Sequence, residues 1–211
     1  MKELKRLFNN YSWLDILRLS RDLILTKIFF PAHIRLIRQP SYIIGKKHIK
    51  FGKNFNSGVL LRIEVLDKSF LRHPLIGVKD DPKLVIGDNV NVNFNVHIGV
   101  LKRVEIGNNV LIGSNVLIID HNHGNYKLEN QDNPFSIPKD RQSIAESIKI
   151  GNNVWIGENV CVLPGTIVGD GCIIGANTVL NGIYKKNQII VGSPSRPIKE
   201  FNITSKTWEA L

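Results

Sequence analysis

Two histidines in the segment VLIIDHNHGNY, residues 116–126, are the side chains of this chain best suited to proton transfer. A neutral imidazole with a pKa near neutrality can take a proton from a hydroxyl, so His121 and His123 are both candidate general bases. His121 stands where neighbouring stretches carry asparagine, and we interpret it as a turn residue. His123 stands where no turn or core position requires an imidazole, which makes it the stronger candidate.

Asn93 and Trp155 are two further side chains that the local pattern does not explain. Asn93 directly follows Val92, at a position where glycine is common in this chain, and Trp155 lies in NNVWIG at the same relative position as His123. A ring as large as indole should project from a corner of the fold and not into a narrow core. We treat both as candidate ligand contacts, with plain surface position for Asn93 and loop packing for Trp155 as the alternatives.

A six-residue repeat must position these side chains. Its leading residue is apolar and mostly branched, and its fourth residue is Asn or Gly, the types that adopt a left-handed backbone at least cost. Short repeats of fixed period are typical of parallel β-solenoids, in which each coil buries its apolar corner against the next. The leading residues are Ile86, Val92, Ile98, Ile106, Ile112, Ile118, Ile150, Ile156, Val162, Val168, Ile174 and Leu180, with a looser repeat at Ile43, Ile49, Phe55 and Leu61.

Interruptions of the repeat divide the chain. The step of eight residues from Ile98 to Ile106 predicts a bulge at 100–103. The gap in the repeat before Ile150 predicts that residues 123–146 form a loop that projects from the solenoid. We expect an N-terminal accessory segment over 1–34, a β-helix over 35–184 and a C-terminal tail over 185–211. Residues 12–30 predict an amphipathic helix that begins after Ser12, and residues 198–211 predict a short closing helix.

The charge is concentrated near the amino terminus. The chain of 211 residues has a net charge of +10, and residues 1–50 carry eleven Lys or Arg against three acidic residues, a net charge of +8. Because no nucleic-acid-binding module is recognisable, we expect no nucleic acid partner. We expect the helix to pack its apolar side on the solenoid, with contact to the inner membrane surface as the alternative. No signal peptide pattern opens the chain, so the expected location is cytoplasmic.

The same residues carry a family resemblance. Asn93-Phe94-Asn95, His123 and Trp155 occur in the order and register of the galactoside and maltose acetyltransferases, which are hexapeptide-repeat enzymes. The resemblance implies a left-handed parallel β-helix and a homotrimer with active sites between subunits. It also implies that His123 is the general base, that Asn93 holds the acceptor sugar and that Trp155 lines its site. The motif DHNHG at 120–124 is more similar to the corresponding motif in acetyltransferases of surface-polysaccharide gene clusters.

The carboxyl end carries a second part of the resemblance. VGSPSRPIKEF, residues 191–201, resembles the family's turn near the coenzyme, which implies acetyl-CoA as the acetyl donor and no metal. Two departures are visible, because the loop after the histidines is longer than in the galactoside enzymes and LNGIYKKN replaces the family's usual VTKDIP. The coenzyme contacts implied by the resemblance are Gly175, Ala176, Lys185, Ser193, Pro194 and Arg196.

The sequence therefore predicts an all-β enzyme that transfers acetyl from acetyl-CoA to a saccharide hydroxyl, with a bacterial surface polysaccharide or its precursor as acceptor. Three alternatives remain open at this point. The acceptor could be the amine of an amino sugar or sugar nucleotide. The solenoid could be a carbonic anhydrase of the gamma class, with His97, His121 and His123 as zinc ligands across a trimer interface. The chain could also be a catalytically silent scaffold.

Overall fold

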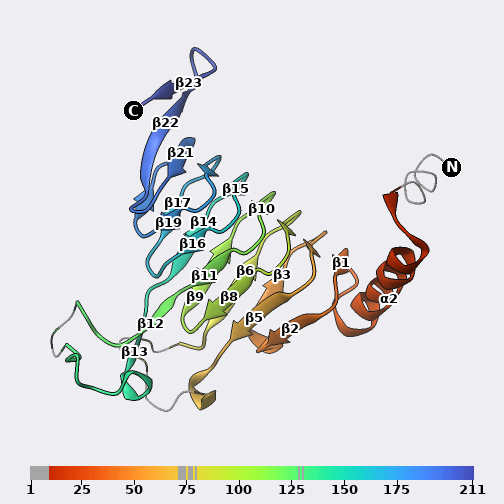
Figure 1. The fold of residues 1–211 in the computed structure, drawn as a ribbon, viewed down its shortest axis with the longest axis horizontal. Helices are drawn as coiled ribbons and strands as arrows, with labels where there is room; N and C mark the ends of the chain where they lie inside the picture. The colour runs from red at the N-terminus through yellow and green to blue at the C-terminus, as the bar shows by residue number, and fades with distance from the viewer. Residues whose placement is uncertain (1–9, 71–74, 76–77, 79, 128, 130) are drawn as a thin grey trace.

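The computed structural model of the protein describes residues 10–70, 75, 78, 80–127, 129 and 131–211. The chain winds into a triangular solenoid whose three faces are sheets of short parallel strands (Figure 1). We name the faces A, B and C in the order in which each coil visits them, and we name each edge by the two faces that it joins. The N-terminal helix and the C-terminal hairpin lie at opposite ends of the stack.

The strands of each face are stacked one coil apart. Face A contains β1 (Leu36–Ile37), β4 (Asn56–Ser57), β7 (Asn91–Val92), β10 (Leu111–Ile112), β15 (Trp155–Ile156), β18 (Ile173–Ile174) and β21 (Gln188–Val191). Face B contains β2 (Ser41–Ile44), β5 (Leu61–Val65), β8 (His97–Val100), β11 (Leu117–Ile119), β16 (Cys161–Val162) and β19 (Val179–Leu180). Face C contains β3 (Ile49–Phe51), β6 (Lys83–Ile86), β9 (Arg103–Ile106), β14 (Ile148–Ile150), β17 (Ile167–Val168) and β20 (Ile183–Tyr184). Three short 3-10 helices lie in the connections, at Lys46–His48, Lys68–Phe70 and Pro138–Asp140.

The six-residue repeat explains both the core and the corners. The leading residues from Ile86 to Leu180 are all at most 2% exposed, and burying each such side chain contributes about 1.5 to 3 kcal/mol. The fourth-position asparagines turn the chain with φ between 54° and 59°, as the sequence predicts. They also stack, since the amide of Asn89 donates to Asn109 at 3.0 Å and that of Asn109 donates to Asn153 at 3.1 Å. The corner residues therefore form hydrogen-bonded ladders along the stack.

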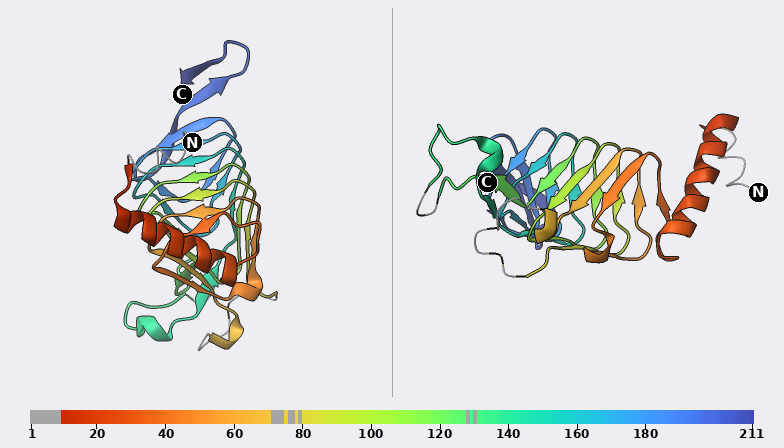
Figure 2. Two further views of the ribbon diagram at one scale, coloured as in Figure 1. Left: turned by 90° about the vertical axis from the view of Figure 1, so that its right-hand side faces the viewer. Right: turned by 90° about the horizontal axis from the view of Figure 1, so that it is seen from below.

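Helix α2 (Trp13–Phe29) lies across the N-terminal end of the stack (Figure 2). Ser12 and Asp15 form the capping box that starts it, which confirms the predicted N-cap. The predicted packing of its apolar side on the solenoid is wrong, because the two fully buried residues of the helix are Asp22 and Thr26. Burial alone would raise the pKa of Asp22, but hydrogen bonds from Arg21 and Arg38 hold it below its ordinary value.

Thr26 joins the helix to the first coil. Its hydroxyl donates to the carbonyl oxygen of Asp22 at 2.7 Å and accepts from the backbone N–H of Ile37 at 2.9 Å. Thr26→Val keeps the shape but leaves that buried N–H without an acceptor, so we expect the helix to dock about 1 to 2 kcal/mol less stably. Hydrogen exchange over residues 13–29 measures this change, with Ser20→Ala on the exposed side of the helix as the control. Equal protection in Thr26→Val and the unaltered protein would contradict the docking role of Thr26.

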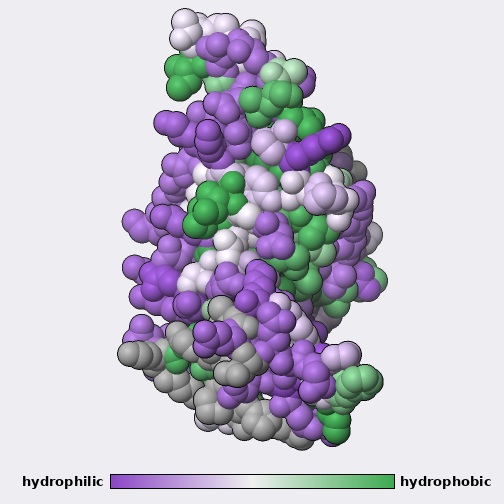
Figure 3. Space-filling view, turned by 90° about the vertical axis from the view of Figure 1, so that its left-hand side faces the viewer, coloured by the Kyte–Doolittle hydropathy of each residue, from purple (hydrophilic) through white to green (hydrophobic). Residues whose placement is uncertain are grey.

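The carboxyl end forms a hairpin and not the predicted closing helix. Strand β22 (Arg196–Asn202) pairs antiparallel with β21 and with β23 (Thr207–Ala210), and the rings of Phe201 and Trp208 meet edge to face. Lys206 enters the turn with φ of 56°, a conformation that a helix does not contain. Figure 3 shows hydrophobic side chains over the projecting hairpin and the last coils, where Ile183, Ile203 and Leu211 are exposed.

Candidate active site

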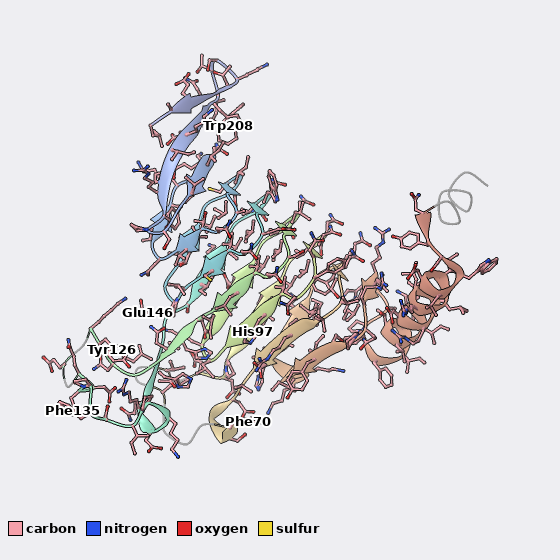
Figure 4. All side chains as sticks on the ribbon, viewed as in Figure 1. Phe70, His97, Tyr126, Phe135, Glu146 and Trp208 are labelled. Atoms are coloured by element: carbon pink, nitrogen blue, oxygen red, sulfur yellow. The ribbon has the colours of Figure 1, made fainter. Side chains whose placement is uncertain are left out.

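The candidate histidines lie on a second hairpin, which leaves the solenoid at the B–C edge after β11. Strand β12 (His121–His123) pairs antiparallel with β13 (Ser143–Ala145), so the predicted loop over 123–146 has a paired base. Gly124 turns the chain away with φ of 112°, and a Cβ atom there would lie 2.5 Å from the hydroxyl of Tyr126. Figure 4 shows Tyr126 and Phe135 out along this hairpin.

Hydrogen bonds outside the ladder hold the backbone of His123. The hydroxyl of Tyr126 donates to the carbonyl oxygen of His123 at 2.7 Å. Arg141 donates to the Tyr126 hydroxyl at 2.7 Å and to the carbonyl oxygen of Ser136 at 2.7 Å. These hydrogen bonds stabilise the part of the hairpin next to the histidines and fix the backbone position from which the His123 side chain extends.

Asp120 anchors the hairpin to the solenoid. Its carboxylate is fully buried and accepts the backbone N–H groups of Leu101, Lys102 and Arg103, each at 2.8 Å. These three residues lie in the bulge that the two additional residues between Ile98 and Ile106 create, so the predicted bulge at 100–103 is confirmed. The Asp120 carboxylate satisfies its backbone donors. The same carboxylate lies 3.0 Å from Nδ1 of His121.

The two histidines differ in environment. His121 is a strand residue without the left-handed backbone of the corner asparagines, so its interpretation as a turn residue is wrong. Its side chain is 13% exposed, is hydrogen-bonded to Asp120 and packs over Gly99. The imidazole of His123 is exposed, and its ring centre lies 6.4 Å from that of His121 in an edge-to-face arrangement. The exposed imidazole of His123 is therefore the one of the two rings that a substrate can reach more readily.

A small polar cluster on face B borders His121. Nε2 of His97 lies 2.9 Å from a carboxylate oxygen of Glu64, which also accepts from Arg62 at 2.7 Å. Burial lowers the pKa of His97 below its ordinary value, and the bond to Glu64 only partly offsets this. Burial would raise the pKa of Glu64, but Arg62 and His97 together lower it. The ring of His97 is therefore held by Glu64 on face B, beside His121.

The histidines of the zinc alternative have carboxylate partners within one chain. The ring of His97 is hydrogen-bonded to Glu64 and that of His121 to Asp120. Within the described parts of the chain, no group of three or more His, Cys, Asp or Glu side chains is arranged to hold a metal ion.

Most of the other candidate residues lie along the A–B edge or on face A. Asn93 begins that edge after β7, and Trp155 projects from face A one coil below β10 with 53% of its surface exposed. Gly175 and Ala176 form the same edge after β18. The N–H of Gly192 donates to the hydroxyl of Thr178 at 3.1 Å. This bond places the segment with Ser193, Pro194 and Arg196 one coil after Gly175 and Ala176 at that edge. Lys185 lies apart from these residues, after β20 at the edge between faces C and A.

A single chain does not bring the candidate residues together. The histidines lie at the B–C edge, whereas Asn93 and the coenzyme candidates other than Lys185 lie at the A–B edge, on the other side of face B. Along the solenoid axis, however, His123, Asn93 and Trp155 belong to neighbouring coils. His123 follows β11, whose coil begins with β10, and the strand order places Asn93 one coil before β10 and Trp155 one coil after it. At about 4.8 Å per coil, these residues lie within one coil step of a common plane.

Three contributors escaped the sequence analysis. Asp120 was missed although it holds the third position of its hexad, where Asp88, Asn108 and Asp170 accept N–H groups of the preceding coil. An insertion in that preceding coil was the available signal, because its additional donors require an acceptor. Tyr126 and Arg141 were missed because the loop carries no repeat from which their contact could be inferred.

Comparison with known proteins identifies the family of the chain. Residues 147–182 match the family model described as "Bacterial transferase hexapeptide (six repeats)". The chain is 40% identical over 205 residues to the putative lipopolysaccharide biosynthesis O-acetyl transferase WbbJ of Escherichia coli K12, covering 97% of each protein. It is 37% identical over 122 residues to the galactoside O-acetyltransferase of the same strain, covering 57% of this chain and 56% of that protein.

Solved structures show the same fold. A maltose O-acetyltransferase from Clostridium difficile 630 superposes with a TM-score of 0.55 at 23% identity, covering 90% of each chain. The N-acyltransferase AntD from Bacillus cereus superposes with a TM-score of 0.58 at 17% identity, covering 92% of each chain. Together with the repeat match, these similarities identify the solenoid as the predicted left-handed parallel β-helix.

Proposed function

Because the chain belongs to the hexapeptide-repeat acetyltransferases, we propose that it transfers an acetyl group from acetyl-CoA to a hydroxyl of a saccharide. The acceptor is a bacterial surface polysaccharide or its precursor, as the name of the 40% identical relative suggests. One observation carries the proposal. The exposed imidazole of His123 lies on a hairpin that hydrogen bonds stabilise, within about one coil of Asn93 and Trp155 along the solenoid axis.

Transfer needs one base and no covalent enzyme intermediate. A ring nitrogen of His123 takes the proton of the acceptor hydroxyl while its oxygen attacks the thioester carbonyl carbon. The tetrahedral intermediate then expels the coenzyme A thiolate, which receives that proton from the imidazolium, so an ester and free coenzyme A result. Holding the two substrates in contact supplies the proximity contribution. The Asp120 carboxylate orients His121, which packs edge-on to the base and supports its position.

The site is completed by a second subunit in this proposal. A threefold axis parallel to the solenoid preserves heights, so the B–C edge of one subunit can meet the A–B edge of its neighbour if face B is turned to the axis. The outward residues of the later coils of face B support this choice, since Leu117, Cys161 and Val179 carry no charge, although Arg62 lies earlier in the same ladder. Over the same coils the outward ladder of face C begins with Lys149.

The acceptor is tested with the producing cell. Mass spectrometry of its surface glycans, with and without the chain, should show the loss of one acetyl group per repeating unit when the chain is removed. Supplying His123→Ala should fail to restore it, whereas the unaltered chain should. Glycans that are identical in all strains would overturn the saccharide assignment, and loss of an amide-linked acetyl group would identify an amine acceptor.

A further inference from the structure

Helix α2 turns an apolar stripe away from the protein. Trp13, Leu17, Ile24 and Ile28 share one side of the helix, and each is between 60% and 73% exposed. The opposite side carries Asp22 and Thr26, whose bonds to Arg38 and Ile37 fix the rotation of the helix about its axis. The stripe is therefore held outward by buried polar contacts.

Such an orientation reverses the usual rule for a surface helix, which buries its apolar side against the core. A row of exposed large apolar side chains such as Leu17, Ile24 and Ile28 marks an interaction site. The helix does not span a bilayer, since none in the described part of the chain is long and apolar enough to do so. A helix of this kind can instead lie in the plane of a membrane interface.

The charge around the helix identifies the occupant. Residues 10–50 carry eight Lys or Arg against Asp15 and Asp22, a net charge of +6. Exposed Arg18 and Arg21 lie on the helix itself, where they pair with these two carboxylates. Anionic lipid headgroups complement this charge, while the acyl region receives the stripe. We propose that α2 is an interfacial anchor that docks the enzyme on an anionic lipid bilayer, with the stripe of Trp13, Leu17, Ile24 and Ile28 inserted.

Anchoring also fits the position of the helix. The helix lies across the end of the stack (Figure 2). Because Asp22 and Thr26 bind the first coil from the opposite side of the helix, the stripe is on the side away from the coils. In a trimer about an axis parallel to the solenoid, three stripes would face one plane, and binding would gain from multivalency. This last step rests on the proposed trimer, whereas the anchor itself does not. A surface-bound enzyme would meet lipid-linked acceptors as they lie in the membrane.

Vesicle sedimentation of the full chain tests the anchor without any activity measurement. The unaltered protein should sediment with vesicles of phosphatidylcholine and phosphatidylglycerol, and less with phosphatidylcholine alone. Leu17→Gln with Ile24→Gln should lower partitioning about a hundredfold, because each buried side chain contributes about a factor of ten. Glutamine keeps good helix propensity, so the helix itself should persist.

The matched control replaces two equally exposed apolar residues at the opposite end of the stack. Ile183→Gln with Ile203→Gln should leave vesicle binding unchanged. Sedimentation of the helix variant at the level of the unaltered protein would overturn the proposal, as would absence of binding by the unaltered protein. A change of oligomeric state in the helix variant, with vesicle binding retained, would assign the stripe to a second copy of the chain instead.

Discussion

Replacing His123 with alanine is expected to lower kcat by about 10²- to 10⁴-fold, the contribution of a positioned general base. The exposed ring makes no contact on which the core depends, so the fold should be kept. Release of coenzyme A thiol from acetyl-CoA in the presence of acceptor measures the rate. Thermal unfolding and molecular mass in solution should match those of the unaltered enzyme.

His121→Asn is the informative comparison for His123→Ala. It removes the imidazole that packs against the base and touches Asp120, so we expect a smaller loss of kcat. His33→Ala, far away beside Phe51 in the first coil, should leave the rate unchanged. If His121→Asn abolishes transfer while His123→Ala does not, the Asp120 and His121 pair is the base and our assignment is wrong.

Replacing Asp120 with asparagine is expected to destabilise the protein more than any other single polar substitution in the site. The carboxylate accepts four hydrogen bonds, two at each oxygen. In asparagine one of these oxygens becomes an NH₂ group, whose own N–H donors would face two of the four N–H groups. Leaving buried donors unpaired costs about 2 to 4 kcal/mol in total, which corresponds to about 5 to 15 °C in Tm for a chain of this size. Differential scanning calorimetry measures the shift.

Asp88→Asn provides the matched control. Asp88 also accepts a backbone N–H of the preceding coil, from Lys53 at 2.7 Å, but at an exposed corner. Asparagine already fills the same role in the next coils, where Asn108 and Asn152 accept the N–H groups of Asp88 and Asn108. We expect a change of less than about 0.5 kcal/mol there. Equal Tm values for Asp120→Asn and Asp88→Asn would contradict the anchoring role of Asp120.

The solenoid could be predicted from the sequence because its determinants are local. Each hexad specifies its own corner, through an inward aliphatic residue and a left-handed Asn, and the coil repeats that information. The exit of the chain after Ile118 was visible for the same reason, since the repeat stops there. Helix α2 was placed within a residue at each end because its N-cap and its apolar spacing are local as well.

The errors arose where distant residues decide the structure. The rotation of α2 depends on Asp22 pairing with Arg38, sixteen residues away, and apolar spacing alone predicts the opposite side as buried. The C-terminal hairpin depends on pairing with β21 and on the Phe201 and Trp208 contact. Likewise, the two edges that carry the candidate site are separated by a whole face, which no motif spacing reveals.

Mixed trimers test the central claim, that the site is shared between subunits, most directly. His123→Ala and the double variant Asn93→Ala with Trp155→Ala should each be nearly inactive alone. When the two are co-expressed in equal amounts, random assembly places an intact His123 opposite an intact Asn93 and Trp155 at about a quarter of the interfaces. We therefore predict recovery of about a quarter of the unaltered activity. A co-expressed mixture as inactive as its two components would contradict a site built from two subunits.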